Sequence, residues 1–339
     1  MNKILVIGAG GFIGSHLCEE ILNVHPDWEI TAVDITTTKI QHLLDKPNFN
    51  FLKINILSEV NAVDELVKTH DIVLPLAAVA NPSIYVQDPL RVFALDFEAN
   101  LQIVKSAAKH HTRVVFPSTS EVYGMCGDEE FVEDSSNCVT GPICKQRWIY
   151  SCCKQMLDRI IYALGVQDKN FDYTLFRPFN WIGPRLDDIS NPANGSSRVV
   201  TQFLSNILHG QNIQLVGGGA QIRCFTYISD GISALIKILE NENGCASKQI
   251  FNIGNPSNEL SIKDLASKIK KIAMNYSSIK ENAENIEIIS VDPDDYYGES
   301  YQDVSRRVPS IMNSSELLGW EPKVGIDELL TKTMDFYFN

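Results

Sequence analysis

The sequence has no apolar run of membrane-spanning length and no pair of cysteines at metal-binding spacing. A transmembrane helix needs roughly 18 consecutive apolar residues, and no stretch of this chain provides them. The eight cysteines are scattered without CxxC spacing, which argues against a zinc knuckle or a disulfide framework. Because the first apolar run begins at Ile4, we also expect no signal peptide. These absences predict a cytoplasmic chain with no membrane segment and no metal site.

Basic residues are scarce as well. The chain has 29 Lys and Arg against 42 Asp and Glu, for a formal net charge of -13. Proteins that bind the phosphate backbone usually carry a basic surface excess, so nucleic acid is not an expected partner. A few arginines that converge in one pocket can still bind a small anion. The composition therefore leaves an anionic small molecule open as a ligand.

What the sequence does contain is an alternation of strand-like and helix-like segments. The run Lys3–Ile7 breaks into a glycine-rich turn and continues with helical spacing. Because parallel strands need crossover connections, such alternation is typical of a parallel sheet with helices on both faces. We therefore expect an α/β fold with a doubly wound parallel (Rossmann) sheet, its further strands at 29–33, 51–54, 72–76, 113–117 and 173–176.

The amino-acid composition changes beyond Pro178. Gly, Asn, Pro and Ser concentrate at 183–197, and loop-rich insertions of this kind tend to carry binding residues. Later segments again resemble regular structure, with helices at 199–208, 229–240 and 261–274 and a strand at 250–253. We expect a Rossmann domain at 1–178, with returns to it near 225–255, and a smaller C-terminal lobe at 179–339 that is mainly substrate-binding.

Three glycines follow the first strand at the spacing of a dinucleotide-binding turn. Gly8, Gly11 and Gly14 would give a tight bend, close backbone approach to pyrophosphate and close packing of helix on strand. The helix N-terminus would then face the phosphates. Asp34 lies twenty residues past Gly14, where a carboxylate accepts hydrogen bonds from the adenosine ribose and repels the extra phosphate of NADP. The predicted cofactor is therefore NAD.

Further cofactor contacts are expected in this turn and at the ends of the third and fourth strands. Small residues there would let the cofactor lie close to the sheet, although plain core packing explains the strand ends equally well. The residues concerned are Phe12, Ile13, Asn55, Ile56, Leu76, Ala77 and Ala78.

Tyr150 and Lys154 stand one helical turn apart, so both project from the same helix face. A lysine and the positive nicotinamide of NAD both stabilise a phenolate, which could then take a proton from a substrate hydroxyl. A Tyr-x-x-x-Lys pair alone is common, but it becomes specific after a dinucleotide fold and the segment 118–124. We predict a catalytic pair that works with hydride transfer to NAD. Cys152 and Cys153 between them are interpreted as small packing residues.

These motifs resemble those of the extended short-chain dehydrogenases, the NAD-dependent epimerase/dehydratase family. The similarity runs from the first strand to the last helix. One branch is especially similar, the UDP-glucuronic acid oxidative decarboxylase domain of the bifunctional polymyxin-resistance enzyme. This resemblance implies oxidation of a nucleotide sugar at C4, followed by loss of carbon dioxide to a UDP-4-keto-pentose. The segments that carry it are 117–126, 147–151, 176–187 and 301–304.

The resemblance also implies roles for individual residues. Thr119 and Ser120 would hydrogen-bond around C4 and the carboxylate, where Tyr150 and Lys154 act. Glu121 would be an acid/base or a positioning group, with a buried structural carboxylate as the alternative. Arg307 would anchor the carboxylate or protonate C5, with a solvated basic pair as the alternative. Contacts with the nucleotide sugar, including its diphosphate, would come from Arg147, Asn180, Arg198, Arg223 and Tyr301.

Two positions depart from this branch: Ala220 replaces an expected lysine, and Asn55 replaces a usual aspartate. The alternatives are a UDP-xylose synthase, which would reduce the ketone again, a 4-epimerase, or another enzyme acting on a nucleotide sugar. A non-catalytic NAD-binding regulator is the alternative of another class, and the Tyr150 and Lys154 pair argues against it. The family commonly dimerises through helices such as those expected at 100–108 and 150–164, so the resemblance implies a homodimer.

Overall fold

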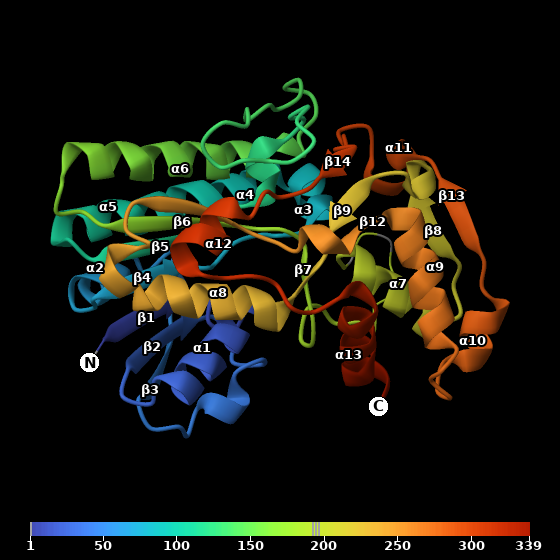
Figure 1. Cartoon of the computed structure of the whole chain (residues 1–339), viewed down its shortest axis with the longest axis horizontal. Coiled ribbons are helices and arrows are strands. Elements are labelled where there is room, and N and C mark those ends of the chain that lie inside the picture. Colours follow the sequence, from blue (N-terminus) through green and yellow to red (C-terminus); the bar gives the residue numbers. More distant parts are fainter. Residues whose placement is uncertain (1, 192, 194, 196) are drawn as a thin grey trace.

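The computed structural model describes residues 2–339 apart from residues 192, 194 and 196. Its centre is a seven-stranded sheet in the order β11-β6-β5-β4-β1-β2-β3, with every neighbouring pair parallel (Figure 1). This confirms the predicted doubly wound α/β fold. The strands are β1 (Lys3–Ile7), β2 (Glu29–Asp34), β3 (Phe49–Lys53), β4 (Ile72–Pro75), β5 (Arg113–Pro117), β6 (Tyr173–Pro178) and β11 (Gln249–Ile253).

Helices cover the sheet on both faces, which is why its central strands are apolar throughout rather than alternating. All of β4 and β5 is buried, as is β1 after its first residue. One face carries α1 (Phe12–Val24), α8 (Ile228–Glu240) and α12 (Met312–Leu318), and the other carries α2 (Val60–Lys68), α5 (Asn100–His110) and α6 (Trp148–Gln167) (Figure 1). The chain thus returns to the main sheet with α8 and β11 after leaving it at β6.

The second lobe is built from three small sheets and a group of helices. Its sheets pair β7 (Trp181–Ile182) with β10 (Thr226–Tyr227), β8 (Ile213–Val216) with β13 (Ile288–Val291), and β9 (Ile222–Cys224) with both β12 (Glu259–Ser261) and β14 (Arg306–Arg307). Its helices are α7 (Val199–Leu208), α9 (Ile262–Ala273), α10 (Lys280–Asn285), α11 (Pro293–Tyr297) and α13 (Ile326–Phe338).

The connection between β4 and α5 is also helical, through α3 (Pro82–Gln87), α4 (Pro89–Val92) and the π-helix η2 (Phe93–Ala99). Short 3-10 turns complete the fold: η1 (Gln41–Leu43), η3 (Ser120–Tyr123), η4 (Gly217–Gly219), η5 (Glu242–Gly244) and η6 (Pro256–Asn258). Across the part of the chain that the structure describes, no helix combines the length and the apolar character needed to span a membrane.

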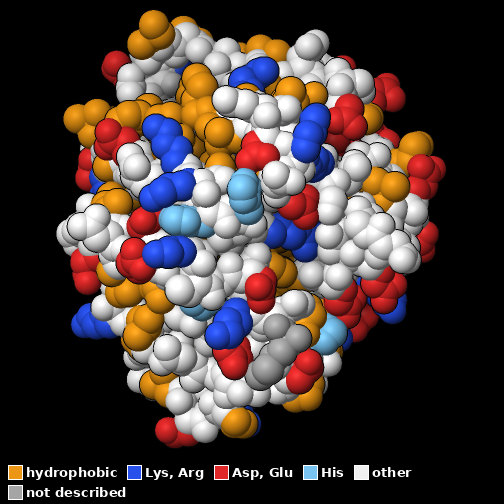
Figure 2. Space-filling model, turned by 90° about the vertical axis from the view of Figure 1, so that its left-hand side faces the viewer, with side chains coloured by type: hydrophobic (Ala, Val, Ile, Leu, Met, Phe, Trp, Pro, Cys, Tyr) orange, Lys and Arg blue, Asp and Glu red, His pale blue; other side chains and the backbone are white. Residues whose placement is uncertain are grey.

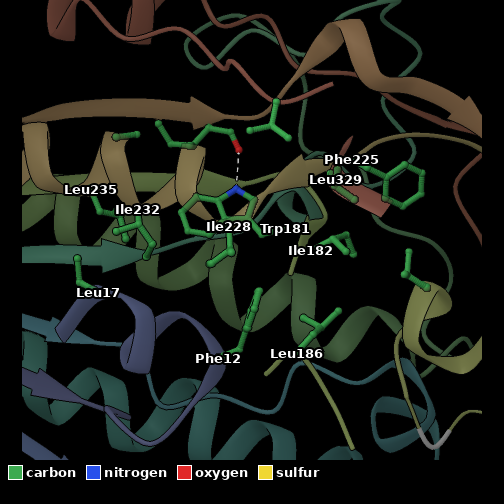
Figure 3. Packing of buried hydrophobic residues seen from close by; sticks show 14 of the residues in the cluster. Phe12, Leu17, Trp181, Ile182, Leu186, Phe225, Ile228, Ile232, Leu235 and Leu329 are labelled. Atoms are coloured by element: carbon green, nitrogen blue, oxygen red, sulfur yellow. Dashed lines mark hydrogen bonds between the residues drawn. The ribbon is translucent and has the colours of Figure 1, made fainter. Parts of the chain in front are cut away.

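A hydrophobic core around Trp181 joins the cofactor half of the molecule to the second lobe. Figure 3 shows Ile228 directly beside the indole and Phe12 further away on the same side, and the indole Nε1 donates to the carbonyl of Ile253 at 2.9 Å. A Cβ on Gly231 would lie 2.6 Å from the indole ring. Helix α8 therefore packs directly on the indole, and the start of α1 is held against the second lobe.

A buried ion pair ties β6 to α6. Arg177 donates through Nη2 to Asp158 at 3.2 Å and through Nη1 to the Tyr123 hydroxyl at 2.8 Å. Both members of the pair are buried. Buried charges are tolerated only when they are paired, and removing one partner leaves the other uncompensated.

We therefore expect Arg177→Met to lower the free energy of unfolding by about 3–5 kcal/mol. Denaturant unfolding followed by circular dichroism measures this change. The double variant Arg177→Met with Asp158→Leu should recover part of the loss, because no unpaired charge remains. Losses that simply add in the double variant would contradict the pairing.

Candidate active site

A pocket with a cavity of about 330 Å³ lies at the carboxyl ends of β1, β4, β5 and β6. Open α/β sheets bind their ligands at this edge. One wall comes from the turn after β1 and the loop after β4, and the opposite wall comes from the second lobe. The pocket therefore spans the two halves of the chain.

The glycine turn after β1 is packed too tightly for any side chain. Gly8 has a φ of +89°, and a Cβ there would lie 2.6 Å from the backbone nitrogen of Ala77. A Cβ on Gly14 would lie 2.4 Å from the carbonyl oxygen of Gly8. Gly11 caps α1 without a side-chain hydrogen bond, and the first turn of α1 has no acidic residue. The first N–H groups of α1 therefore have no side-chain acceptor, which suits an anionic group such as pyrophosphate.

Asp34 closes this turn from the end of β2. Its Oδ2 accepts from the Gly10 N–H at 2.8 Å, and its Oδ1 accepts from the Ile35 and Thr36 N–H groups at 2.7 and 3.1 Å. A carboxylate has about four acceptor sites, and these three N–H groups leave one of them free, on Oδ2. Asp34 can thus receive a ribose hydroxyl while it orders the turn, and the residues present fit a dinucleotide.

The other expected cofactor contacts fall into two groups. Phe12, Ile13, Leu76 and Ala78 line the pocket, while the backbone of Ala77 lies under Gly8. The remaining two residues, Asn55 and Ile56, do not line it, because Ile56 is buried in the core and the Asn55 Oδ1 accepts from its neighbour Leu57 at 3.1 Å.

Tyr150 and Lys154 lie on the buried face of α6 and both line the pocket. The Lys154 Nζ donates to the carbonyl of Pro117 at 3.0 Å and lies 5.9 Å from the centre of the Tyr150 ring. The ring of Tyr85 stacks on Tyr150 at 4.7 Å, nearly parallel. Tyr85, which comes from the short helix α3, was not predicted as a site residue. The helix face that was predicted to be catalytic is thus closed on one side by an aromatic ring.

In the protein without bound NAD, the pKa of Tyr150 lies above its usual value. Burial raises the pKa of Tyr150, and the charge of Asp96 raises it further, whereas a hydrogen bond with Thr119 acts in the other direction. Lys154 is itself fully buried, and burial lowers its pKa. The Tyr150 phenol therefore keeps its proton unless a further positive charge comes close.

Glu121 lies in η3, between two buried arginines. Its Oε2 is 2.8 Å from the Arg147 Nη2, and its Oε1 is 2.9 Å from the Arg307 Nη1. Burial opposes ionisation of Glu121, but the two guanidinium groups outweigh it and lower the pKa to about 2. Glu121 is thus a permanent anion that positions arginines, and it is not a proton donor at neutral pH. Arg307 is 4% exposed, so the solvated basic pair is excluded.

The three arginines expected at the diphosphate lie in two groups. Arg147 lies at Glu121, with Arg223 nearby on Asp303 at 2.7 Å. Arg198 instead binds Asp187 at 2.7 Å and lies 5.5 Å from the centre of the Phe12 ring, at the glycine turn. All three side chains line the same pocket, so their expected contact with a diphosphate stays a prediction.

The arginine group around Glu121 keeps unused hydrogen-bond donors. Among the described residues, Nε and Nη1 of Arg147 and Nε of Arg307 have no hydrogen-bond partner, although they are buried. Among the described residues, the ion-pair partners of this group are two carboxylates, Glu121 and Asp303. The group has three arginines, Arg147, Arg223 and Arg307, so it carries a net positive charge. Buried donors without a partner are rare. The pocket wall is therefore suited to an anion such as a carboxylate.

The remaining expected residues also line the pocket. Thr119 and Ser120 lie beside Glu121 after β5, and the Asn180 Nδ2 donates to the Cys224 carbonyl at 3.0 Å. Cζ of Arg147 lies over the ring of Tyr301, 5.6 Å from the ring centre. Several lining residues were not predicted, because nothing in their local sequence distinguishes them: Ala80, Tyr85, Gln214, Gln221, Tyr296 and Tyr297.

The glycine turn with Asp34, together with a Tyr150 and Lys154 pair at the same pocket, defines a dinucleotide-binding enzyme of the short-chain dehydrogenase type. Residues 4–254 match the NAD dependent epimerase/dehydratase family, and the chain belongs to that family. The predicted cofactor, NAD, is confirmed as the cofactor of the family.

Solved structures of other proteins share this fold over nearly their whole length. The PbgP3 protein from Burkholderia pseudomallei is 46% identical, with a TM-score of 0.90, over 99% of this chain and 96% of that one. A UDP-glucuronic acid 4-epimerase from Bacillus cereus is 23% identical, with a TM-score of 0.80, over 98% of both chains. A UDP-glucose 4-epimerase from Thermotoga maritima is also 23% identical, with a TM-score of 0.80, over 99% of this chain and 98% of that one.

The glycine turn supports a test of cofactor binding. Gly14→Ala places a methyl group 2.4 Å from the Gly8 carbonyl oxygen and must push the turn apart. We expect the dissociation constant for NAD to rise by about tenfold or more, measured by isothermal titration calorimetry. The matched control is Gly127→Ala, whose added methyl group meets nothing within 4 Å. Equal affinities of the two variants would show that the turn does not bind NAD.

Proposed function

We propose that this protein oxidises the C4 hydroxyl of UDP-glucuronic acid with NAD and then decarboxylates the product to a UDP-4-keto-pentose. The observation that carries this proposal is the positive pocket wall of Arg147 and Arg307 around Glu121, with buried N–H donors that lack partners. Those donors match a sugar that bears a carboxylate, because guanidinium groups bind carboxylates through paired hydrogen bonds. The segments that resemble a UDP-glucuronic acid decarboxylase support the same substrate.

The residues around the sugar C4 would perform the oxidation. Tyr150 takes the proton of the C4 hydroxyl, and Thr119 and Ser120 hydrogen-bond the substrate beside it. Lys154 supplies positive charge behind the phenol. Bound at the glycine turn and Asp34, NAD supplies the acceptor for the hydride that leaves C4.

Oxidation makes decarboxylation possible. A ketone at C4 turns the substrate into a β-keto acid, so the bond between C5 and the carboxylate can break with its electron pair moving to the C4 oxygen. Tyr150, now protonated, donates a hydrogen bond to that oxygen and stabilises the enolate. Arg147 and Arg307 hold the departing carboxylate in one orientation, and C5 of the enolate takes up a proton from solvent to complete the product. Glu121 keeps the two arginines in place because it stays ionised.

We assign the nucleotide half of the substrate to residues 179–339, the lobe that the sequence predicts to be mainly substrate-binding. Asn180, Arg223, Gln214 and Gln221 line that part of the pocket. Ala220 is exposed and does not line it, so the missing lysine leaves the pocket wall intact.

All eight cysteines are free thiols, which supports the proposed cytoplasmic location.

The direct test is incubation with NAD and UDP-glucuronic acid, with NADH absorbance and released carbon dioxide followed together. We expect both in equal amounts, because the ketone is released without being reduced again. Carbon dioxide without net NADH would indicate a xylose synthase. If UDP-glucuronic acid is converted to its C4 epimer without carbon dioxide, the decarboxylase is excluded in favour of a 4-epimerase.

A variant separates this site from the cofactor site. Arg307→Lys keeps the charge beside Glu121 but loses the paired geometry, so we expect carbon dioxide release to fall by about 100-fold. The affinity for NAD should stay unchanged, because Arg307 lies on β14 in the second lobe. Wild-type release by this variant would remove Arg307 from the proposed mechanism.

We also propose that the protein is a homodimer built on the outer face of α6. Met156, Tyr162 and Val166 of that helix are exposed, as are Leu90 of α4 and Phe93 of η2, which pack beside it. Figure 2 shows hydrophobic side chains gathered in the upper part of one end of the molecule, at the height of α6 in Figure 1. Patches of this kind commonly mark protein interfaces.

Sedimentation velocity measures this assembly. We expect the wild-type protein to sediment as a dimer and Met156→Glu to sediment as a monomer, because a charge in an apolar interface must be desolvated. The control is Val24→Glu, which places the same charge on an exposed apolar residue of α1. A monomeric wild-type protein, or a dimer in both variants, would refute this interface.

A further inference from the structure

A buried carboxylate that the proposed chemistry does not use lies behind Tyr150 and Lys154. Asp96 is 0% exposed and lies in the π-helix η2, which packs against α6. Its Oδ2 accepts from the Val79 N–H at 2.9 Å, while its Oδ1 has no hydrogen-bond partner among the described residues. An unsatisfied buried carboxylate is costly, and π-helical turns are frequent at functional sites. Asp96 therefore requires an explanation beyond packing.

The titratable groups that face Asp96 come from two elements. Tyr150, Cys153 and Lys154 belong to α6, and Tyr85 belongs to α3. Burial is the largest influence on the pKa of all four groups, and the negative charge of Asp96 in addition raises the pKa of each. Asp96 thus acts on both members of the Tyr150 and Lys154 pair.

Lys154 needs a counter-charge. Its ammonium group is 1% exposed and makes a single hydrogen bond, to the Pro117 carbonyl. Burial lowers the pKa of Lys154, and Asp96 opposes this more strongly than Asp158 does. Asp158 is already bound by Arg177 at 3.2 Å and by the Ser118 hydroxyl at 2.7 Å. Among the described residues Asp96 has no such ion pair, so its charge stays uncompensated and acts on Lys154 through the buried interior.

We propose that Asp96 is a positioning residue, the buried counter-ion that keeps Lys154 an ammonium inside the pocket. This inference rests on the proposed roles of Tyr150 and Lys154. A neutral lysine would give a phenolate no electrostatic support, and burial alone drives a lysine toward its neutral form. The side chain of Asp96 thus acts on the reaction through Lys154 and need not touch the substrate.

The proposal predicts an unusual dependence of stability on pH. Burial raises the pKa of Asp96 from 3.8 to about 6 in the folded protein. The folded state therefore binds this proton more tightly than the unfolded state, so the stabilising contribution is complete below about pH 4 and lost as the pH rises through 6. Above pH 6 the ionised Asp96 destabilises the fold.

Thermal unfolding tests the pairing without any substrate. Asp96→Asn keeps an oxygen for the Val79 N–H, so we expect a higher melting temperature at pH 8 and a gain that shrinks between pH 6 and pH 4. The matched control is Asp187→Asn, which should lower the melting temperature at pH 8, because the ion pair with Arg198 holds the pKa of Asp187 below its usual value. In a Lys154→Met background, Asp96→Asn should give a larger gain than in the wild-type protein, because Asp96 has then lost its cation. Equal gains in the two backgrounds overturn the proposal.

The pH profile of NADH formation tests the effect on the reaction. Removing the charge of Asp96 lowers the pKa of both Tyr150 and Lys154, so Asp96→Asn should move both limbs of the profile to lower pH by about one unit. If the rate of NADH formation falls but both limbs of the profile stay at the same pH, the role of Asp96 is structural only and the proposal is overturned. If UDP-glucuronic acid is not a substrate, the proposed function fails, and the melting temperatures still decide the role of Asp96.

Discussion

The pairing of Glu121 with Arg147 and Arg307 is the interaction on which the rest of the site depends. Glu121 follows β5 of the main sheet, Arg147 precedes α6, and Arg307 lies on β14 of the second lobe. A carboxylate buried alone would be protonated, and two guanidinium groups buried alone would repel each other. Together they stay charged, and they fix the place where the main sheet meets the second lobe. Their unused N–H groups give that junction its affinity for an anion.

This pairing also orders the neighbouring elements. Arg147 immediately precedes α6, so its anchoring sets the position of Tyr150 and Lys154 in the first two turns of that helix. Arg307 lies beside Arg223 in the parallel pairing of β14 with β9, an arrangement of like charges that Glu121 and Asp303 make tolerable. The proposed reaction centre on α6 and the proposed anion site on the second lobe are thus joined by a single buried charge cluster.

Features of the site that depend on local sequence could be predicted, and features that depend on long-range burial could not. The turn at Gly8 and the spacing of Tyr150 and Lys154 follow from strand and helix periodicity alone. The pairing of Glu121 with Arg147 and Arg307 joins segments far apart in the sequence. Its residues could be named from the resemblance, but its geometry could not be predicted. The ion pair of Arg198 with Asp187 could not be predicted either, because it is a tertiary contact. The raised pKa of Tyr150 was missed because burial is a property of the whole fold.

The surroundings of Tyr150 explain why its buried phenol is protonated in the protein alone. Burial raises the pKa of the phenol, and two carboxylates, Asp96 and Glu121, raise it further, so the protein alone keeps Tyr150 protonated. The phenol becomes a base only when positive charge is added beside it. Oxidised NAD carries that charge on its nicotinamide and reduced NAD does not. In the proposed reaction, the strength of the base would thereby depend on the oxidation state of the cofactor, and proton removal would be restricted to the complex that can also accept a hydride.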